Sequence, residues 1–280
     1  MIPAAEIQRA AGALGVEPSR IDLDYTLGWL LRGLVAQPAV TGEWLFKGGT
    51  CLRKCYFPGY RFSEDLDFTL LRAQTAEETE ACVLAAARSA QEGSGIDFQS
   101  QPLRIEVMRG EESGYRVRLY YRGSSPMGGN PRSIQVHVSA AETVETPAQT
   151  RGINHPYSDA AELGAVTLRC YSLVEILAEK LRAICGQRRY ALARDLFDLH
   201  ELMRRGASLQ EATRILPTKC SIKNVTLGKE MLQDFEARVA DFRLDWDRNL
   251  LPLLPQRDKV PFDEAWATAR NAVGMARGGY

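Results

Sequence analysis

Hydrophobic and polar positions in the N-terminal half of the chain follow two periods, one typical of strands and one typical of helices. Alternation of apolar and polar residues predicts a strand, because successive side chains point to opposite faces of a sheet. Apolar residues that recur every three or four positions predict helices over 20–36 and 75–91. The predicted strands cover residues 43–47, 66–71, 103–110, 115–123 and 133–140. The polar positions of 115–123 are mostly arginines, so this strand is expected to expose a basic face.

The pattern changes after Pro156, where helical periodicity replaces the strand alternation. The helices predicted there cover residues 172–186, 190–204, 208–215, 226–245 and 262–276. We therefore predict an α+β, bilobed fold, in which residues 1–160 form a lobe with a mixed sheet and flanking helices. Residues 161–280 are predicted to form a helical lobe, and the two lobes join near 155–171.

Composition places the chain among ordinary globular proteins. It has 280 residues, 45% of them hydrophobic and 25% charged, and a formal net charge of zero, so nucleic acid would have to bind to a local basic patch. No apolar run is long enough for a membrane helix, and the N-terminus lacks the apolar core of a secretion signal. The six cysteines include no CxxC pair and no neighbouring histidine cluster. We expect free thiols and a cytoplasmic location without membrane partners.

Asp65 and Asp67 are the first candidates for chemistry. They alternate with the apolar residues Leu66 and Phe68, which predicts that both carboxylates lie on one face of a strand. Their Cα atoms would then be roughly 6.5–7 Å apart. Oxygen-rich pairs of this kind suit Mg²⁺, which takes substrate phosphates and waters as its other ligands. A solvated acidic pair on an edge strand is the alternative interpretation.

Gly48, Gly49 and Thr50 lie between a predicted strand and a predicted helix that continues to about Cys55. Glycines let a ligand approach the backbone closely, and a helix start offers free N–H groups to an anion. Thr50 is a suitable N-cap, and Lys47 stands immediately before the turn. The alternative is a plain glycine turn with a capping threonine. Together with the aspartates, however, the turn predicts a site for phosphoryl or nucleotidyl transfer.

Five segments in fixed order extend this pattern, and together they resemble one family. They are IDLDYTL (21–27), KGGTCLRK (47–54), RFSEDLDF (61–68), SLVEILAEKLRA (172–183) and ARDLFDL (193–199). This series resembles the AbiEii/MenT nucleotidyltransferase-like toxins, which belong to the polymerase-β-type nucleotidyltransferase superfamily. The resemblance spans about residues 20–205. It implies a nucleotidyltransferase-type sheet in the N-terminal lobe and a helical lobe that closes the active-site cleft.

The resemblance also implies a function. It implies a Mg²⁺-dependent enzyme, with Mn²⁺ as the alternative ion, that transfers NMP from an NTP to the 3′ end of tRNA and so blocks translation. A cognate antitoxin encoded by a neighbouring gene is the expected partner. The implied catalytic residues are Asp65, Asp67, Lys180 and Asp195, with both N-terminal aspartates as metal ligands. The implied nucleotide-binding residues are Lys47, Gly48, Gly49, Thr50, Arg61, Ser63, Lys180 and Asp198.

The C-terminal motifs also carry information of their own. Ser172 and Glu175 have the spacing of a capping box, which predicts the start of a helix. Lys180 falls on the apolar face of that helix, where it either extends its ammonium to the surface or points at the triphosphate. Asp195 and Asp198 share one helix face and form either a surface ion-pair cluster or part of the site. Asp195 is expected to act as a base or to position the nucleophile.

Residues 180–205 contain more basic than acidic side chains. The basic residues are Lys180, Arg182, Arg188, Arg189, Arg194, Arg204 and Arg205, and the acids are Asp195, Asp198 and Glu201. Such a local excess could bind an RNA backbone, or it could be a solvated helix face.

His137 marks a departure from the family pattern, because many relatives have an acid at the matching strand position. It is either a buried strand residue, a third metal ligand or a catalytic base, and Glu106 is a candidate substitute for the acid. The sequence therefore leaves open whether one or two metal ions bind. For the same reason, a non-catalytic relative that only binds an NTP or a partner stays open as an alternative. NMP transfer onto a protein target also stays open, because the sequence does not identify the acceptor.

Overall fold

A computed structural model describes residues 1–124, 130–188 and 190–277 of the chain. The chain divides into two compact units. The sheet unit comprises residues 1–141, 148–170 and 255–257, and the helical unit comprises residues 142–147, 171–254 and 258–280. The first contains a mixed sheet with flanking helices and the second is helical, which confirms the predicted α+β class.

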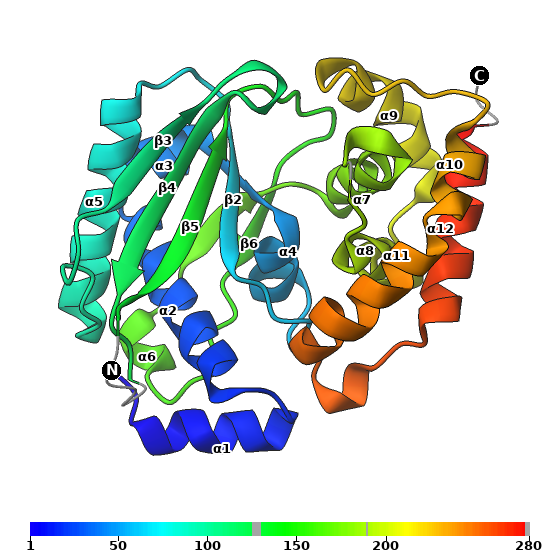
Figure 1. Ribbon diagram of the computed structural model, residues 1–280. Helices are drawn as coiled ribbons and strands as arrows, with labels where there is room; N and C mark the ends of the chain where they lie inside the picture. Colours follow the sequence, from blue (N-terminus) through cyan, green and yellow to red (C-terminus); the bar gives the residue numbers. More distant parts are fainter. Residues whose placement is uncertain (125–129, 189, 278–280) are drawn as a thin grey trace. The chain divides into compact units, whose positions relative to one another are not determined.

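The strands of the described residues form one seven-stranded sheet in the order β3-β4-β5-β2-β1-β7-β6 (Figure 1). Their bounds are β1 (Trp44–Lys47), β2 (Asp65–Leu70), β3 (Arg104–Met108), β4 (Gly114–Tyr121), β5 (Arg132–Ser139), β6 (Gln149–Gly152) and β7 (Thr167–Cys170). Strand β2 pairs antiparallel with β1 and parallel with β5, so the sheet is mixed. This pairing places β2 between the strands that carry Lys47 and His137.

The alternation in the sequence matches the burial of these strands. Leu66 and Phe68 of β2 are buried, whereas Asp65 and Asp67 are half-buried on the opposite face. In β4 the side chains of Val117 and Leu119 are buried and Arg118 is exposed. The predicted strands of the N-terminal half are therefore confirmed, each to within about two residues at either end.

Helices of the sheet unit pack against one another and against the sheet. They are α1 (Ala4–Leu14), α2 (Pro18–Val35), α3 (Pro38–Glu43), α4 (Gly48–Cys51), the π-helix η1 (Leu52–Tyr56), α5 (Ala76–Ser94), the 3₁₀ helix η2 (Gly110–Glu112) and α6 (Ala160–Leu163). Helix α2 packs on α5, and α5 packs on β3 and β4 (Figure 1). Gly33 permits this approach, because a Cβ there would collide with the backbone oxygen of Ala86. The predicted helices 20–36 and 75–91 are thus present as α2 and α5.

Strands β6 and β7 were not predicted. Each has only four residues, and the side chains of β6 are mostly exposed, so neither shows a clear alternation of apolar and polar positions. Strand β7 pairs parallel with β1, with Cys170 opposite Phe46. Residues 161–170, which the sequence grouped with the helical lobe, therefore end in a strand of the sheet.

Helices account for most of the helical unit. They are α7 (Leu173–Arg182), the π-helix η3 (Ala183–Gln187), α8 (Ala193–Arg204), α9 (Leu209–Ile222), α10 (Met231–Ala237), α11 (Val239–Asp245), the π-helix η4 (Trp246–Leu250), the 3₁₀ helices η5 (Leu251–Leu253) and η6 (Gln256–Asp258, mostly in the sheet unit), and α12 (Phe262–Arg277). The single helix predicted over 226–245 is wrong in two respects, because it begins only at Met231 and is interrupted. Arg238, with ψ of 10°, leaves the helical conformation and separates α10 from α11.

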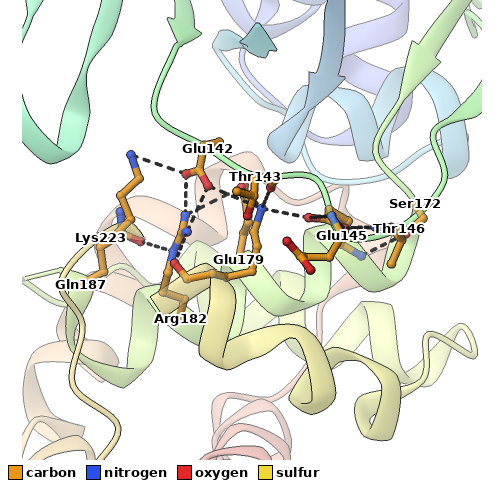
Figure 2. Close-up of polar contacts among 11 residues, drawn as sticks. Glu142, Thr143, Glu145, Thr146, Ser172, Glu179, Arg182, Gln187 and Lys223 are labelled. Atoms are coloured by element: carbon orange, nitrogen blue, oxygen red, sulfur yellow. Dashed lines mark hydrogen bonds and ion pairs between the residues drawn. The ribbon is translucent and has the colours of Figure 1, made fainter. Parts of the chain in front are cut away.

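A buried ionic network joins the segment 142–147 to α7 and α9 (Figure 2). The Lys219 ammonium lies 2.9 Å from a Glu175 carboxylate oxygen and 3.1 Å from one of Glu179. Arg182 donates to both carboxylate oxygens of Glu142, at 3.1 and 2.8 Å. Each buried charge in this network has an opposite partner. The charged side chains can therefore stay buried while they hold the segment 142–147 against the helices.

Candidate functional site

The turn between β1 and α4 brings Gly48 against Asp67. Lys47 pairs with Asp67 across β1 and β2, and the next residue, Gly48, has φ of +80°. A Cβ at Gly48 would collide with Oδ2 of Asp67. Both the positive φ and the lack of space require glycine here, and the turn therefore packs directly against the carboxylate.

Gly49 gives room to two polar side chains from the following loop. A Cβ at Gly49 would collide with the Arg61 guanidinium and would lie 3.0 Å from Oγ of Ser63. Arg61 is buried and donates to the carbonyl of Phe62 at 3.1 Å. The turn, a buried cation and a hydroxyl predicted from the sequence therefore lie together in the sheet unit.

Thr50 has a different role from the predicted one. Helix α4 begins at Gly48 with Lys47 as the N-cap, so Thr50 lies inside the helix and is not its cap. Its buried hydroxyl donates to the carbonyl of Asp65 at 2.5 Å. This bond fastens the start of the helix to the first residue of β2, and Thr50 positions the turn relative to the aspartates.

His137 lies where the sequence predicted it, on the strand next to Asp67. The two residues are direct partners in the parallel pairing of β2 and β5, and Nδ1 of His137 is 3.2 Å from Oδ1 of Asp67. Its Nε2 is 3.2 Å from Oε1 of Gln135. Burial disfavours the imidazolium, but the hydrogen bond to Asp67 and the charges of Asp67 and Asp65 outweigh it and raise the pKa of His137. His137 is thus only partly buried and contacts one of the predicted metal ligands.

Glu106 is too distant to replace the missing acid. It lies on β3, and β4 and β5 separate that strand from β2. With strands about 4.8 Å apart, Glu106 and Asp67 are separated by roughly 14 Å across the sheet. The Glu106 carboxylate instead pairs with Arg116 at 3.1 Å. The suggestion that Glu106 completes the acidic set is therefore wrong.

A buried cluster around Asp24 explains two of the recognised segments and was missed by sequence reasoning. Oδ1 of Asp24 accepts a bond from Arg53 at 2.6 Å, and Oδ2 accepts from Lys54 and from Tyr157 at 2.8 and 2.7 Å. Burial raises the pKa of Asp24, but the charges of Arg53 and Lys54 outweigh it and lower the pKa well below its usual range. The cluster joins η1 to α2. Asp24 and Lys54 therefore hold the helical segment after the glycine turn in place and are not themselves part of the candidate site.

Lys180 is held between Asp195 and Asp198 in the helical unit. Its ammonium lies 2.7 Å from a carboxylate oxygen of each, and both aspartates are buried on α8. Arg188 approaches the other oxygen of Asp195 at 2.9 Å. Burial raises the pKa of Asp195, but the positive charges of Lys180 and Arg188 outweigh this effect and lower the pKa below its ordinary value. The three predicted residues therefore form one buried ion cluster, and neither the solvated lysine nor the surface ion pairs of the alternative interpretations are present.

The predicted capping box of α7 is only half formed. Ser172 accepts a bond from the Glu175 amide at 3.0 Å, as predicted. The Glu175 carboxylate accepts instead from the amide and hydroxyl of Thr146 at 2.9 and 2.8 Å and pairs with Lys219. Glu175 thus anchors the segment 142–147, because a buried carboxylate gains more from several donors and a cation than from one N-cap amide.

The basic excess of 180–205 is largely neutralised within the helical unit. Arg182 pairs with Glu142, which lies outside that segment, and Arg204 and Arg205 both pair with Glu201. Lys180 and Arg188 are paired with buried aspartates, as described above. Arg189 lies outside the described residues. The sequence count overstated the free positive charge, because Glu142 neutralises Arg182 from a distant part of the chain and the acids within the segment each pair with at least one of its cations.

Asp65 and Asp67 fit a divalent cation in part. They share one half-buried strand face, and the Gly48 turn lies directly against the Asp67 carboxylate. Among the described residues, these aspartates and His137 do not form a group of three ligand atoms within 4.8 Å of one another. An ion held here would therefore take further oxygens from substrate phosphates and water, as Mg²⁺ commonly does.

Comparisons with known proteins agree with this fold. No curated protein sequence matches the chain. MenT4, a nucleotidyltransferase toxin from Mycobacterium tuberculosis H37Rv, is 21% identical, with 99% of this chain and 90% of MenT4 covered and a TM-score of 0.63. JHP933 from Helicobacter pylori is 20% identical, with 94% of each chain covered and a TM-score of 0.59. At these low sequence identities, the structural similarity shows a shared fold.

No helix of the described residues is both long and apolar enough to cross a bilayer.

The family described as "Nucleotidyl transferase AbiEii toxin, Type IV TA system" matches residues 29–269, a range that contains the glycine turn, both strand aspartates and the Lys180 cluster. The chain therefore belongs to the AbiEii nucleotidyltransferase toxin family of type IV toxin–antitoxin systems.

Proposed function

We propose that this chain transfers a nucleoside monophosphate from an NTP to the 3′ end of tRNA, with Mg²⁺ as its cofactor and Mn²⁺ as the alternative ion. The family supplies the reaction class and the toxin role, and the ion and the acceptor are our proposal. The observation that carries it is the pair Asp65 and Asp67 on one face of β2 beside the Gly48 turn. The toxin would act in the cytoplasm, opposed by an antitoxin from a neighbouring gene.

The sheet unit supplies the metal ligands and the phosphate contacts in this proposal. Asp65 and Asp67 would hold the ion, which when bound would offset negative charge on the phosphates. Backbone N–H groups of Gly48 and Gly49 would contact the phosphates, because glycine permits close approach. Arg61 and Ser63 border the same turn and would contact phosphate oxygens.

The helical unit supplies a cation for the leaving pyrophosphate. We assign this role to Lys180, and Asp195 and Asp198 would hold its ammonium in place. A carboxylate with a lowered pKa is a weak base at neutral pH. Of the roles open to Asp195, we therefore propose that of a positioning residue.

A basic strand face supports RNA as the acceptor over a protein. Asp65 pairs with Gln135, Gln135 with Arg118, and Arg118 with Arg104 across β2, β5, β4 and β3. Directly paired residues share a sheet face, so these arginines lie on the face of the aspartates. Arg104 and Arg118 are both exposed, and positive charge beside a site of nucleotidyl transfer favours a phosphodiester backbone.

The test uses purified protein, Mg²⁺, a tRNA pool and each of the four α-labelled NTPs in separate reactions. Label should enter tRNA with the wild-type chain and disappear with Asp65→Asn. Glu106→Gln is the matched control, because it removes a carboxylate from the same sheet face at a distance from β2. Periodate-oxidised tRNA, which lacks a 3′-terminal diol, should accept no label.

Three outcomes would contradict the proposal. Label on a protein band instead of tRNA would favour transfer onto a protein target. Nucleotide binding without any transfer would favour a non-catalytic relative, for which His137 in place of an acid is the specific observation. Equal labelling by wild type and Asp65→Asn would remove the proposed metal site.

A further inference from the structure

Three cysteines that are distant in the sequence come together in the sheet unit. Cys51 lies on α4, Cys55 on η1 and Cys170 at the end of β7. Their sulfur atoms all lie within 4.8 Å of one another, and none of the three is in a disulfide. The trio could not be recognised from local sequence patterns, because two members are four residues apart on a helix and the third lies on an unpredicted strand.

The surrounding fold explains why the thiols meet. Strand β7 pairs parallel with β1, with Cys170 opposite Phe46, so Cys170 lies beside the end of the strand from which α4 starts. Cys51 and Cys55 stand four positions apart on the continuous helical segment, a spacing that places both side chains on one face. Three side chains on two adjoining elements therefore converge on one point.

The distances fit a metal ion bound by three thiolates. A metal about 2.3 Å from each sulfur requires the sulfurs to be about 4 Å apart in trigonal coordination. The observed limit of 4.8 Å is close to this value. Side-chain shifts of less than about 1 Å would complete the coordination.

The donor set selects the class of metal. Among the described residues no histidine or carboxylate joins the three sulfurs within the same reach, so the donors are all soft. Thiolates favour Cu(I) and Zn²⁺, whereas Mg²⁺ prefers oxygen ligands. Closed structural zinc sites have four protein ligands, and this group has three. Cys51 and Cys170 are buried and Cys55 is half-buried, so any open position lies on the side of Cys55.

We propose that Cys51, Cys55 and Cys170 form a site for one soft, closed-shell metal ion, Zn²⁺ or Cu(I), in three-thiolate coordination. The site is separate from the one proposed at Asp65 and Asp67 and does not depend on the proposed function. Binding would release the thiol protons.

Metal binding here would also restrain the glycine turn. Cys51 directly follows Thr50, whose hydroxyl is bonded to the Asp65 carbonyl. An ion that joins Cys51 to Cys170 would link the end of β7 to the first helical turn after Gly48 and Gly49. Because it binds only the folded arrangement of these elements, the ion should raise the thermal unfolding temperature.

The test measures binding by the full chain, kept reduced and metal-free, to Zn²⁺ and separately to Cu(I) under anaerobic conditions. Competition with a chromophoric chelator should show about one tightly bound ion for at least one of the two metals. Cys55→Ser and Cys170→Ser should each weaken that binding at least 10-fold. Cys82→Ser, on α5 of the same unit, is the matched control and should keep wild-type affinity.

X-ray absorption on the wild-type complex tests the site without relying on a variant that could misfold. The expected result is three sulfur neighbours at about 2.3 Å. A shell of nitrogen or oxygen atoms would overturn the proposal, as would equal binding by Cys170→Ser and wild type. The absence of tight binding for both metals would overturn it as well.

Discussion

Two pairs of aspartates in this protein differ in how their charge is balanced. Asp195 and Asp198 are buried on α8 and share the ammonium of Lys180, at 2.7 Å from each. Asp65 and Asp67 are half-buried on β2, beside a glycine turn, and Asp67 contacts His137. The aspartates of the helical unit are therefore buried around a lysine, whereas those of the sheet unit stay partly exposed beside the glycine turn.

Aspartates that hold another side chain in place therefore differ in their surroundings from aspartates that can bind a ligand. A buried carboxylate with a lysine at hydrogen-bond distance is already satisfied and stabilises the fold only as a pair. A half-buried pair on one strand face keeps part of its surface accessible to a ligand.

Asp67→Asn should cause the largest change, and the change should be in activity. Loss of one charged metal ligand is expected to reduce nucleotide transfer about 10²–10³-fold, because a bound ion contributes several kcal/mol to charge stabilisation. Stability should change by less than about 0.5 kcal/mol, since the side chain is partly exposed. Transfer to tRNA and urea unfolding measure the two quantities. A large loss of stability with unchanged transfer would reverse the proposed contrast.

Lys180→Met should affect stability more than Asp67→Asn does. The substitution leaves two buried carboxylates without the ammonium between them, which is expected to cost about 3 kcal/mol. Urea unfolding of the full chain measures the loss. The double variant Lys180→Met with Asp198→Asn should recover part of it, because one of the stranded charges is removed. Additive losses in the double variant would show that Lys180 and Asp198 are not coupled.

Much of the sheet and half of the candidate site could be predicted because the signals are local. The alternation in 65–70 fixed the face of Asp65 and Asp67, and Gly48 and Gly49 marked the turn beside them. The rest depends on contacts between distant segments. Nothing near Cys51 indicates Cys170, and nothing in 180–205 indicates that Glu142 neutralises Arg182. Burial and pairing of this kind follow from the tertiary fold, which local periodicity does not encode.

Asp195→Asn should lower transfer without changing the shape of its pH profile. If Asp195 positions Lys180, the amide weakens that contact and the rate falls about 10-fold at every pH between 6 and 9. A catalytic base would behave differently, because its loss would lower the rate about 10²–10⁴-fold. The measurement is kcat/KM against pH for wild type and variant, and a loss of about 10²-fold or more would assign Asp195 as the base.

The smallest effect concerns acid stability, and it tests whether the helical unit really balances its own charge. The pKa of Asp195 is lowered below its ordinary value of 3.8, so the folded state binds its proton less readily than the unfolded state. The stabilisation that this carboxylate contributes to the folded state is therefore fully present above about pH 5. It is lost as the pH falls below 3.8 toward the lower pKa of the folded state. The stability gap between wild type and Asp195→Asn should accordingly narrow from pH 6 to pH 3, as measured by urea unfolding. The gap between wild type and Cys82→Ser should stay constant over that range, because a thiol does not change charge there. A gap for Asp195→Asn that is also constant would mean that Lys180 and Arg188 do not hold this carboxylate in its charged form.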